Sequence, residues 1–181
     1  MVAAADAAGG RHEAYDRLIE RCKSIGAIVT AVAHPCAQAS LSAADAASAG
    51  IIKPILVGPA EKIRAVAAQH GLDIAGMRIV DAAHSHDAAD KAVAAVRSGE
   101  AEVLMKGSLH TDELMAAVVR RETGLRTARR VSHCFIMAVP SYPRPLIITD
   151  AAVNIAPTLE DSAAATGAAA TLPDGAEDVV N

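Results

Sequence analysis

The chain has 181 residues and a formal net charge of −4, and its composition is 52% hydrophobic but only 2% aromatic, without tryptophan. This length allows one domain with a real core, which must be built from aliphatic side chains and alanine. The mild negative charge, without a basic stripe of interleaved aromatics, excludes a typical nucleic-acid-binding protein. The start lacks the features of a secretory signal and the apolar runs are shorter than the roughly 20 residues of a membrane span, so we expect a cytoplasmic protein without a membrane partner.

Helical and extended patterns alternate along the first two thirds of the chain, separated by glycine and proline. Apolar residues at helical spacing predict helices, and short apolar runs rich in valine and isoleucine predict buried strands. In chain order the pattern predicts a helix at 11–23, a strand at 27–33, a helix from Ser40 or Ser42 to Gly50, a strand at 51–57, a helix at 60–70, a strand at 77–81, a helix at 87–97, a strand at 103–106 and a helix after Thr111.

This alternation is typical of right-handed βαβ units around a parallel sheet, which indicates a doubly wound α/β fold. In such folds, ligands bind beyond the carboxyl ends of the strands. The loops after Ala33, Val57, Asp81 and Lys106 should therefore share one rim of the sheet.

The turn after Lys106 combines features of an anion pocket. Gly107 would allow a close approach of the backbone, and Ser108, His110 or Thr111 could cap the helix that follows. The start of a helix presents unpaired N–H groups and a partial positive charge, and Lys106 would add a full charge. The alternative is that glycine and the cap serve folding alone.

Histidine and aspartate gather in a loop before the helix at 87–97, where His84, His86, Asp87 and Asp90 have the residue types of metal ligands. Ligands packed this closely in sequence rarely reach one ion without help from elsewhere. We therefore expect a solvated loop with Asp87 as a cap, and no metal.

A cysteine beside a histidine and a group of arginines could also take part in chemistry or binding. Cys36 follows His34 across a proline and could suggest a thiolate nucleophile, but without a third orienting group we favour a structural loop. The arginines at 126, 129 and 130 form the densest positive patch in the chain, which could hold a phosphate group or be a solvated loop.

The last third of the chain predicts strands at 131–139 and 146–149, followed by Asp150 and Asn154 as candidate polar groups of the rim. From Ser162 the sequence is rich in alanine and glycine without periodicity, so we expect it to be disordered or at most a frayed helix. The predicted organisation is a flexible N-terminus at 1–10, an α/β domain at 11–161 and a low-complexity tail at 162–181.

Six short motifs follow one another along the chain. They are Ala-Val-Ala-His-Pro-Cys at 31–36, Pro-Ile-Leu-Val-Gly-Pro at 54–59, Leu-Met-Lys-Gly at 104–107, Gly-Leu-Arg-Thr at 124–127, Ser-His at 132–133 and Ile-Thr-Asp-Ala-Ala-Val-Asn-Ile-Ala-Pro at 148–157. Together they resemble the amino-terminal half of the phosphate acetyl/butyryltransferase family. They are similar above all to its butyryltransferase-like branch and to the transferase part of bifunctional enoyl-CoA hydratase/phosphate acetyltransferases.

The resemblance implies a two-domain α/β fold similar to isocitrate and isopropylmalate dehydrogenases, with the active site in the cleft between the domains. It implies the exchange of phosphate and coenzyme A on an acyl group, with coenzyme A as a substrate and no bound cofactor. It places one set of residues at the acyl-phosphate side, namely Lys106, Gly107, Ser108 and Thr111 with Arg126 or Arg129. Asp150 and Asn154 would face the cleft.

The chain also departs from the family pattern. The likeness stops at Asp161, whereas family members continue into a second domain with the serine and aspartate assigned to activation of the thiol. We therefore expect a truncated product with weak or absent transferase activity. The acetyl branch places an arginine where this chain has the apolar Leu114 and Met115, which favours the butyryl-like branch.

Two alternatives remain. The first is a non-catalytic remnant that binds phosphate or coenzyme A, or that pairs with another subunit. An apolar sheet edge at 131–139 would drive self-association, so we expect a homo-oligomer. The second is a dehydrogenase-like relative, which the absence of a dinucleotide fingerprint disfavours.

Overall fold

A computed structural model describes residues 6–128, 131–137, 139, 146–149, 158–159, 163 and 178–180. The chain forms two compact units, one of which is Cys22–Arg126, while the other combines Met1–Arg21 with Thr127–Asn181. The first helix, α1 (Asp6–Ile25), contains the predicted helix at 11–23 and begins earlier, within the segment expected to be flexible. The predicted limits of the α/β domain (11–161) and of the tail (162–181) stay a prediction.

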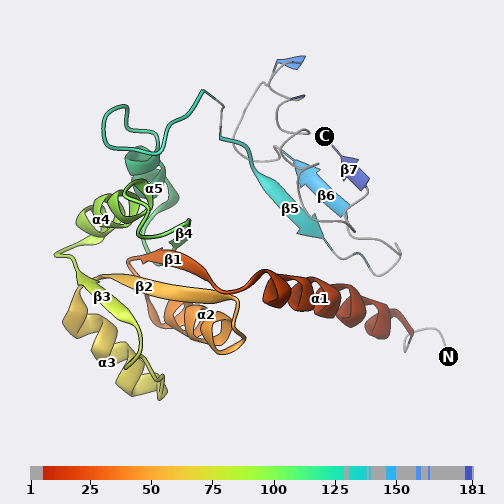
Figure 1. Cartoon of the computed structure of the whole chain (residues 1–181), viewed down its shortest axis with the longest axis horizontal. Helices are drawn as coiled ribbons and strands as arrows, with labels where there is room; N and C mark the ends of the chain where they lie inside the picture. The colour runs from red at the N-terminus through yellow and green to blue at the C-terminus, as the bar shows by residue number, and fades with distance from the viewer. Residues whose placement is uncertain are drawn as a thin grey trace. The chain divides into compact units, whose positions relative to one another are not determined.

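The unit Cys22–Arg126 is built on a parallel sheet of four strands in the order β3-β2-β1-β4 (Figure 1). The strands are β1 (Ile28–Ala33), β2 (Ile52–Gly58), β3 (Arg78–Asp81) and β4 (Val103–Lys106). The helices between and after them are α2 (Ala37–Ser48), α3 (Ala60–His70), α4 (Ser85–Arg97) and α5 (Thr111–Val118). This arrangement confirms the predicted α/β fold with a parallel sheet.

Helices cover both faces of this sheet. Successive side chains of a strand point to opposite faces, so neighbouring strand residues enter different core clusters. Ala31 and Ile55 lie in one core cluster with alanines of α4 and with Leu114 of α5. Val32 and Leu56, one residue further along each strand, lie in a second cluster with side chains of α2 and α3. Strands buried on both faces are continuously apolar, which is the pattern that made them recognisable in the sequence.

The carboxyl ends of the four strands meet at one rim, as predicted. Ala33 of β1 is in register with both Val57 of β2 and Lys106 of β4. Gly58 is in register with Asp81 at the end of β3. The loops after these strands therefore start from neighbouring points.

The predicted start of α2 at Ser40 or Ser42 is wrong. Pro35 ends the preceding strand, Cys36 adopts the extended conformation of an N-cap, and the helix begins at once with Ala37. Ser40 is consequently a helical residue that is 5% exposed, and its hydroxyl has no hydrogen-bond partner among the described residues.

The predicted limits of α3 agree with the structure, whereas the predicted start of α4 does not. α3 spans residues 60–70 and ends at Gly71, whose φ of 64° is the left-handed conformation of a glycine cap. The predicted cap of α4 is wrong by three residues, since the N-cap is His84 and not Asp87.

The other unit contains a small sheet in the order β5-β6-β7. β5 (Cys134–Met137) is antiparallel to β6 (Leu146–Thr149), and β6 is parallel to β7 (Asp178–Val180). β7 lies within the segment 162–181, for which the sequence predicted disorder or at most a frayed helix and no strand. Within the residues described above, none of the helices has the length and apolarity to cross a membrane.

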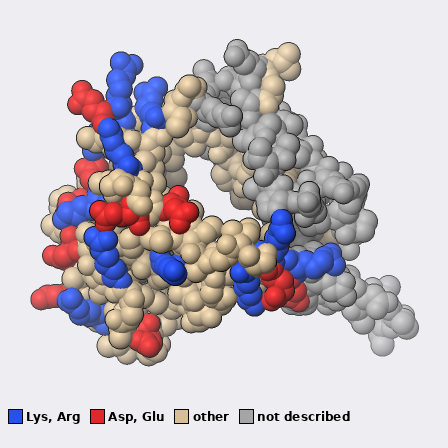
Figure 2. All heavy atoms as spheres, viewed as in Figure 1, with Lys and Arg blue, Asp and Glu red and all other residues tan. Residues whose placement is uncertain are grey.

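Positive and negative side chains are interspersed over the unit Cys22–Arg126 on the face seen in Figure 2. Several are paired, including Arg78 with Glu100 at 2.7 Å and Arg120 with Asp90 at 3.0 Å. These pairs are solvent-exposed, so each contributes little to stability.

Candidate functional site

The turn between β4 and α5 is tied to the end of β1 by its backbone. The N–H of Gly107 donates to the carbonyl oxygen of Ala33 at 2.9 Å, and the N–H of Ser108 donates to that of His34, also at 2.9 Å. The turn is thus a continuation of the pairing between β1 and β4 beyond the last ladder residue.

Gly107 occupies a position that no other residue could take without a shift of the backbone. A Cβ atom added there would lie 2.4 Å from the carbonyl oxygens of both Ala33 and His34. Gly107 therefore allows the close approach of the two strand ends, as the sequence predicted.

His34 is the residue that the sequence analysis did not assign to this site. Its φ of 50° is left-handed, which is uncommon for a residue other than glycine. Its ring Nδ1 lies 2.8 Å from the hydroxyl oxygen of Ser108, and that hydroxyl lies 3.0 Å from the carbonyl oxygen of His34. The strand order β1 beside β4 brings the two residues together, and no local pattern in the sequence reveals that order.

The start of α5 has no side-chain cap. His110 occupies the N-cap position without a side-chain hydrogen bond, and Thr111 is the first helical residue. The first N–H groups of a helix have no intrahelical acceptor, so this end carries a partial positive charge. Asp112 and Glu113 in the first turn match that charge and would also compete with a bound anion.

Lys106 ends β4 with an exposed side chain. Its Nζ atom is 3.4 Å from the carbonyl oxygen of Gly107. Within the described part of the chain, this amine has no carboxylate partner. Its charge is therefore available beside the turn.

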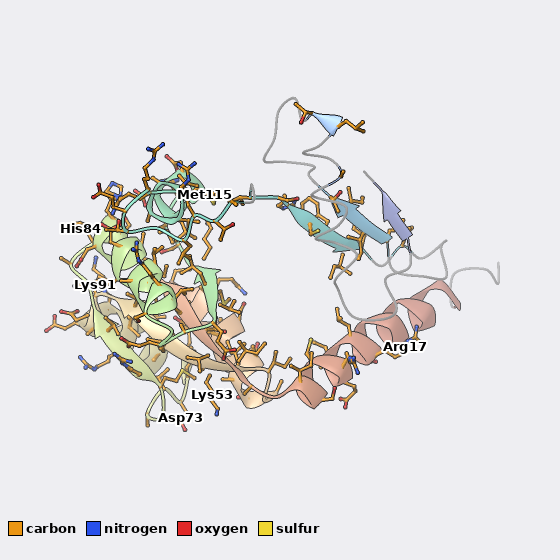
Figure 3. The ribbon with its side chains drawn as sticks, turned by 45° about the horizontal axis from the view of Figure 1, so that its top comes forward. Arg17, Lys53, Asp73, His84, Lys91 and Met115 are labelled. Carbon is orange, nitrogen blue, oxygen red and sulfur yellow. The ribbon has the colours of Figure 1, made fainter. Side chains whose placement is uncertain are left out.

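A second polar cluster lies at the start of α4 (Figure 3), where His84 and Lys91 are labelled. The Nζ atom of Lys91 donates to the carbonyl oxygen of Asp81 and to the Asp87 carboxylate, both at 2.9 Å. The same carboxylate accepts the Ala83 N–H at 2.9 Å, and His84 Nδ1 accepts the Asp87 N–H at 3.2 Å. The bond to His84 is that of an N-cap, and the Asp87 carboxylate adds an acceptor for the N–H of the residue before the cap.

The hydrogen bond from the Ala83 N–H, together with the bond to Lys91, lowers the pKa of Asp87 below its ordinary value. Both donors stabilise the ionised carboxylate. Next to this cluster, His86 Nδ1 lies 3.4 Å from a carboxylate oxygen of Glu113, which links α4 to α5.

The remaining candidates lie on the following loop or outside the described residues. Arg126 is exposed, at the end of a loop that is held by Arg97 through the carbonyl oxygens of Glu122 and Gly124. Three predicted residues, Arg129, Asp150 and Asn154, lie outside the described residues. Cys36 is half-buried as the N-cap of α2, and the described contact of the neighbouring imidazole is with Ser108.

Known proteins similar to this chain include both acetyl and butyryl transferases. A phosphate acetyltransferase of Rhizobium meliloti is 58% identical over 81% of this chain and 46% of its own length. A phosphate butyryltransferase of Clostridium beijerinckii is 34% identical over 81% of this chain and 49% of its own length. The chain thus spans about half the length of these relatives, and the expected greater likeness to the butyryl-like branch is wrong.

A solved structure described as a phosphotransacetylase from Streptococcus pyogenes has the same fold, with a TM-score of 0.71 at 16% identity. The match covers 86% of this chain and 56% of that one. The family described as "Phosphate acetyl/butaryl transferase" matches residues 84–174, which is half of the chain. The chain therefore belongs to the phosphate acetyl/butyryltransferase family of enzymes.

Proposed function

We propose that this chain supplies the phosphate-binding half of a phosphate acyltransferase that converts acyl-CoA and phosphate into acyl phosphate and coenzyme A. In this reaction an oxygen of phosphate attacks the thioester carbonyl, the carbon–sulfur bond breaks, and coenzyme A leaves as the thiolate. Acetyl is the acyl group that the name of the more similar relative supports. The partners of the chain are then acyl-CoA or coenzyme A and phosphate.

The single observation that supports this proposal most is the turn after β4. Gly107 brings the turn against the end of β1, the start of α5 lacks a side-chain cap, and the Lys106 amine lies beside it without a carboxylate partner in the described residues. Backbone N–H groups and a lysine are the usual partners of a phosphate group at a helix start. The Lys106 ammonium group would offset the negative charge of phosphate before the phosphate attacks the thioester.

The other proposed roles follow from the family resemblance. Thr111 would contact the acyl phosphate from the first turn of α5, and Arg126 or Arg129 would add positive charge. Asp150 and Asn154 would face the cleft. Coenzyme A would act as a substrate, and the chemistry requires no metal.

Titration of inorganic phosphate and acetyl phosphate into the ¹⁵N-labelled chain tests the proposal. We expect the amide resonances of residues 107–111 to shift, and Lys106→Met to weaken binding by about tenfold, the factor for one charge-assisted hydrogen bond of about 1.4 kcal/mol. Lys53→Met is the matched control, because Lys53 lies near the amino end of β2, away from the carboxyl rim (Figure 3). Equal weakening by both variants would contradict a specific role of Lys106.

A second candidate, subunit pairing, is favoured by the exposure of β5. Phe135, Ile136 and Met137 are between 42% and 49% exposed, and β5 is an edge of the sheet among the described strands. An exposed apolar edge strand is a template for pairing with another chain. Pairing and phosphate binding do not exclude each other, and self-association is tested separately below.

A further inference from the structure

His34 contacts the proposed phosphate-binding turn with both its backbone and its side chain. Its carbonyl oxygen accepts the Ser108 N–H at 2.9 Å and lies 3.0 Å from the Ser108 hydroxyl, while its ring Nδ1 lies 2.8 Å from the same hydroxyl. Three contacts between the same two residues, 74 positions apart in the sequence, fix the end of β1 against the turn.

These contacts favour one arrangement of the protons. The carbonyl oxygen of His34 can only accept, and the Ser108 hydroxyl has a single proton to donate to it. With that proton engaged, the hydroxyl oxygen accepts from the ring, which favours the neutral tautomer with the proton on Nδ1. In this arrangement, His34 and Ser108 form a closed pair in which each donates to the other.

The backbone of His34 indicates that this pair is a constraint and not a by-product of packing. A left-handed residue other than glycine has a conformational cost and persists where surrounding contacts hold it. That conformation determines where the carbonyl oxygen of His34 points. The direction of this oxygen in turn determines the position of the Ser108 N–H and hydroxyl.

We propose that His34 is a positioning residue for the phosphate site, acting through Ser108; this proposal rests on the function proposed above. Because the Ser108 hydroxyl proton is directed to the carbonyl oxygen of His34, phosphate is met by the open N–H groups at the start of α5 and by Lys106. Ser108 serves to orient the turn. Loss of the His34 ring removes the contact of Nδ1 with the Ser108 hydroxyl and leaves only the two contacts to the His34 carbonyl oxygen, so the turn is held less firmly.

Three substitutions of His34 separate the contribution of the ring from that of the backbone. His34→Ala removes the Nδ1 donor and should weaken phosphate binding about fivefold, the factor for one ordinary hydrogen bond. His34→Asn should restore most of the affinity, because asparagine tolerates left-handed φ and carries an N–H donor on a short side chain. His34→Gly relieves the backbone without restoring the donor, so it should bind as weakly as His34→Ala.

A spectroscopic measurement tests the pair without phosphate. Long-range ¹H–¹⁵N correlation spectra of the unmodified chain at pH 8 should show the proton of the His34 ring on Nδ1. Ser108→Ala should shift the population towards the Nε2–H form, because the acceptor of the Nδ1 proton is lost. Thermal unfolding of each variant verifies that it remains folded.

The outcomes distinguish this inference from the proposed function. A ring proton on Nε2 in the unmodified chain overturns the role of His34, whether or not phosphate binds. Phosphate binding that is unchanged in a folded His34→Ala variant also overturns it, while the proposed function stands. If the unmodified chain fails to bind phosphate, the proposed function and the positioning role both fail, even with the proton on Nδ1.

Discussion

A methyl group added at Gly107 would meet two carbonyl oxygens at 2.4 Å, so Gly107→Ala must move the backbone. We expect a loss of about 1–3 kcal/mol in the free energy of unfolding, typical of overpacking, together with weaker phosphate binding. Chemical denaturation and phosphate titration measure the two effects.

Gly76→Ala is the control for this substitution. Gly76 has no atom within 4 Å of an added Cβ and has no left-handed φ, so alanine there should be neutral or slightly stabilising. Equal destabilisation at the two positions would contradict the steric role of Gly107.

Asp87 predicts a pH dependence of stability. Its pKa is lowered in the folded state, first by the Ala83 N–H and then by Lys91. A lowered carboxylate pKa contributes stability above the unfolded-state value of about 3.9, and that contribution is lost as the pH falls through the folded-state value. Asp87→Asn should therefore destabilise the chain at pH 7, and the difference should shrink as the pH falls below the unfolded-state value and vanish below the folded-state value.

Urea denaturation at pH 7, 5 and 3 measures this difference. Asp45→Asn on α2 controls for the removal of one exposed negative charge. A difference between the unmodified chain and Asp87→Asn that persists unchanged at pH 3 would show that the hydrogen bonds of Asp87 do not depend on ionisation.

Individual residues show which parts of the site the sequence could supply. Lys106 and Gly107 could be proposed from the sequence, because they lie at a predicted strand end just before a helix start, where a group with negative charge can bind. The partnership of His34 with Ser108 was not, because it depends on the contact between two loops that are far apart in the chain. In the sequence, the candidate chemical partner near His34 is Cys36, two residues away.

The position of α5 depends on its buried face. Leu114 is 8% exposed and lies in the core cluster shared with β1, β2 and α4. Leu114→Ala should lower the free energy of unfolding by about 2–4 kcal/mol, because it removes buried apolar surface and leaves a cavity. It should also weaken phosphate binding, since the helix start forms part of the proposed site.

Val119→Ala, just after α5, is the matched control for Leu114→Ala. Val119 is 42% exposed, so its truncation should change stability by no more than about 0.5 kcal/mol. Comparable losses in the two variants, measured by thermal unfolding, would contradict the assignment of the buried face.

The elements themselves were predictable where local chemistry sets their limits. Gly71 ends α3 because glycine adopts the left-handed cap without strain. The start of α2 was not predictable from the serines at 40 and 42, because Pro35 turns the chain early and the N-cap is Cys36, which makes no side-chain cap bond. A helix start without a capping side chain leaves no local signal in the sequence.

At the scale of the whole molecule, β5 predicts self-association. We expect the chain to form oligomers at micromolar concentration in sedimentation experiments, by pairing of β5 with β5 of a second copy. Ile136→Lys should abolish this association, because a lysine on an edge strand opposes pairing. Val119→Lys, a charge at an exposed apolar site outside β5, should leave it intact.

A monomeric chain would contradict this prediction, as would equal effects of the two lysine substitutions. Phosphate binding provides an internal check, because Ile136→Lys changes no residue of the proposed site. Its affinity for phosphate should equal that of the unmodified chain.

The sequence by itself determined the class of fold and the family, because apolar periodicity, glycine stops and short motifs are local properties of the chain. It also determined which strand end carries Lys106 and Gly107. Only the tertiary structure decided that β1 lies between β2 and β4, and hence that His34 meets Ser108. The physical reason is that strand order follows from the packing of helices on both faces of the sheet, which no single stretch of sequence encodes.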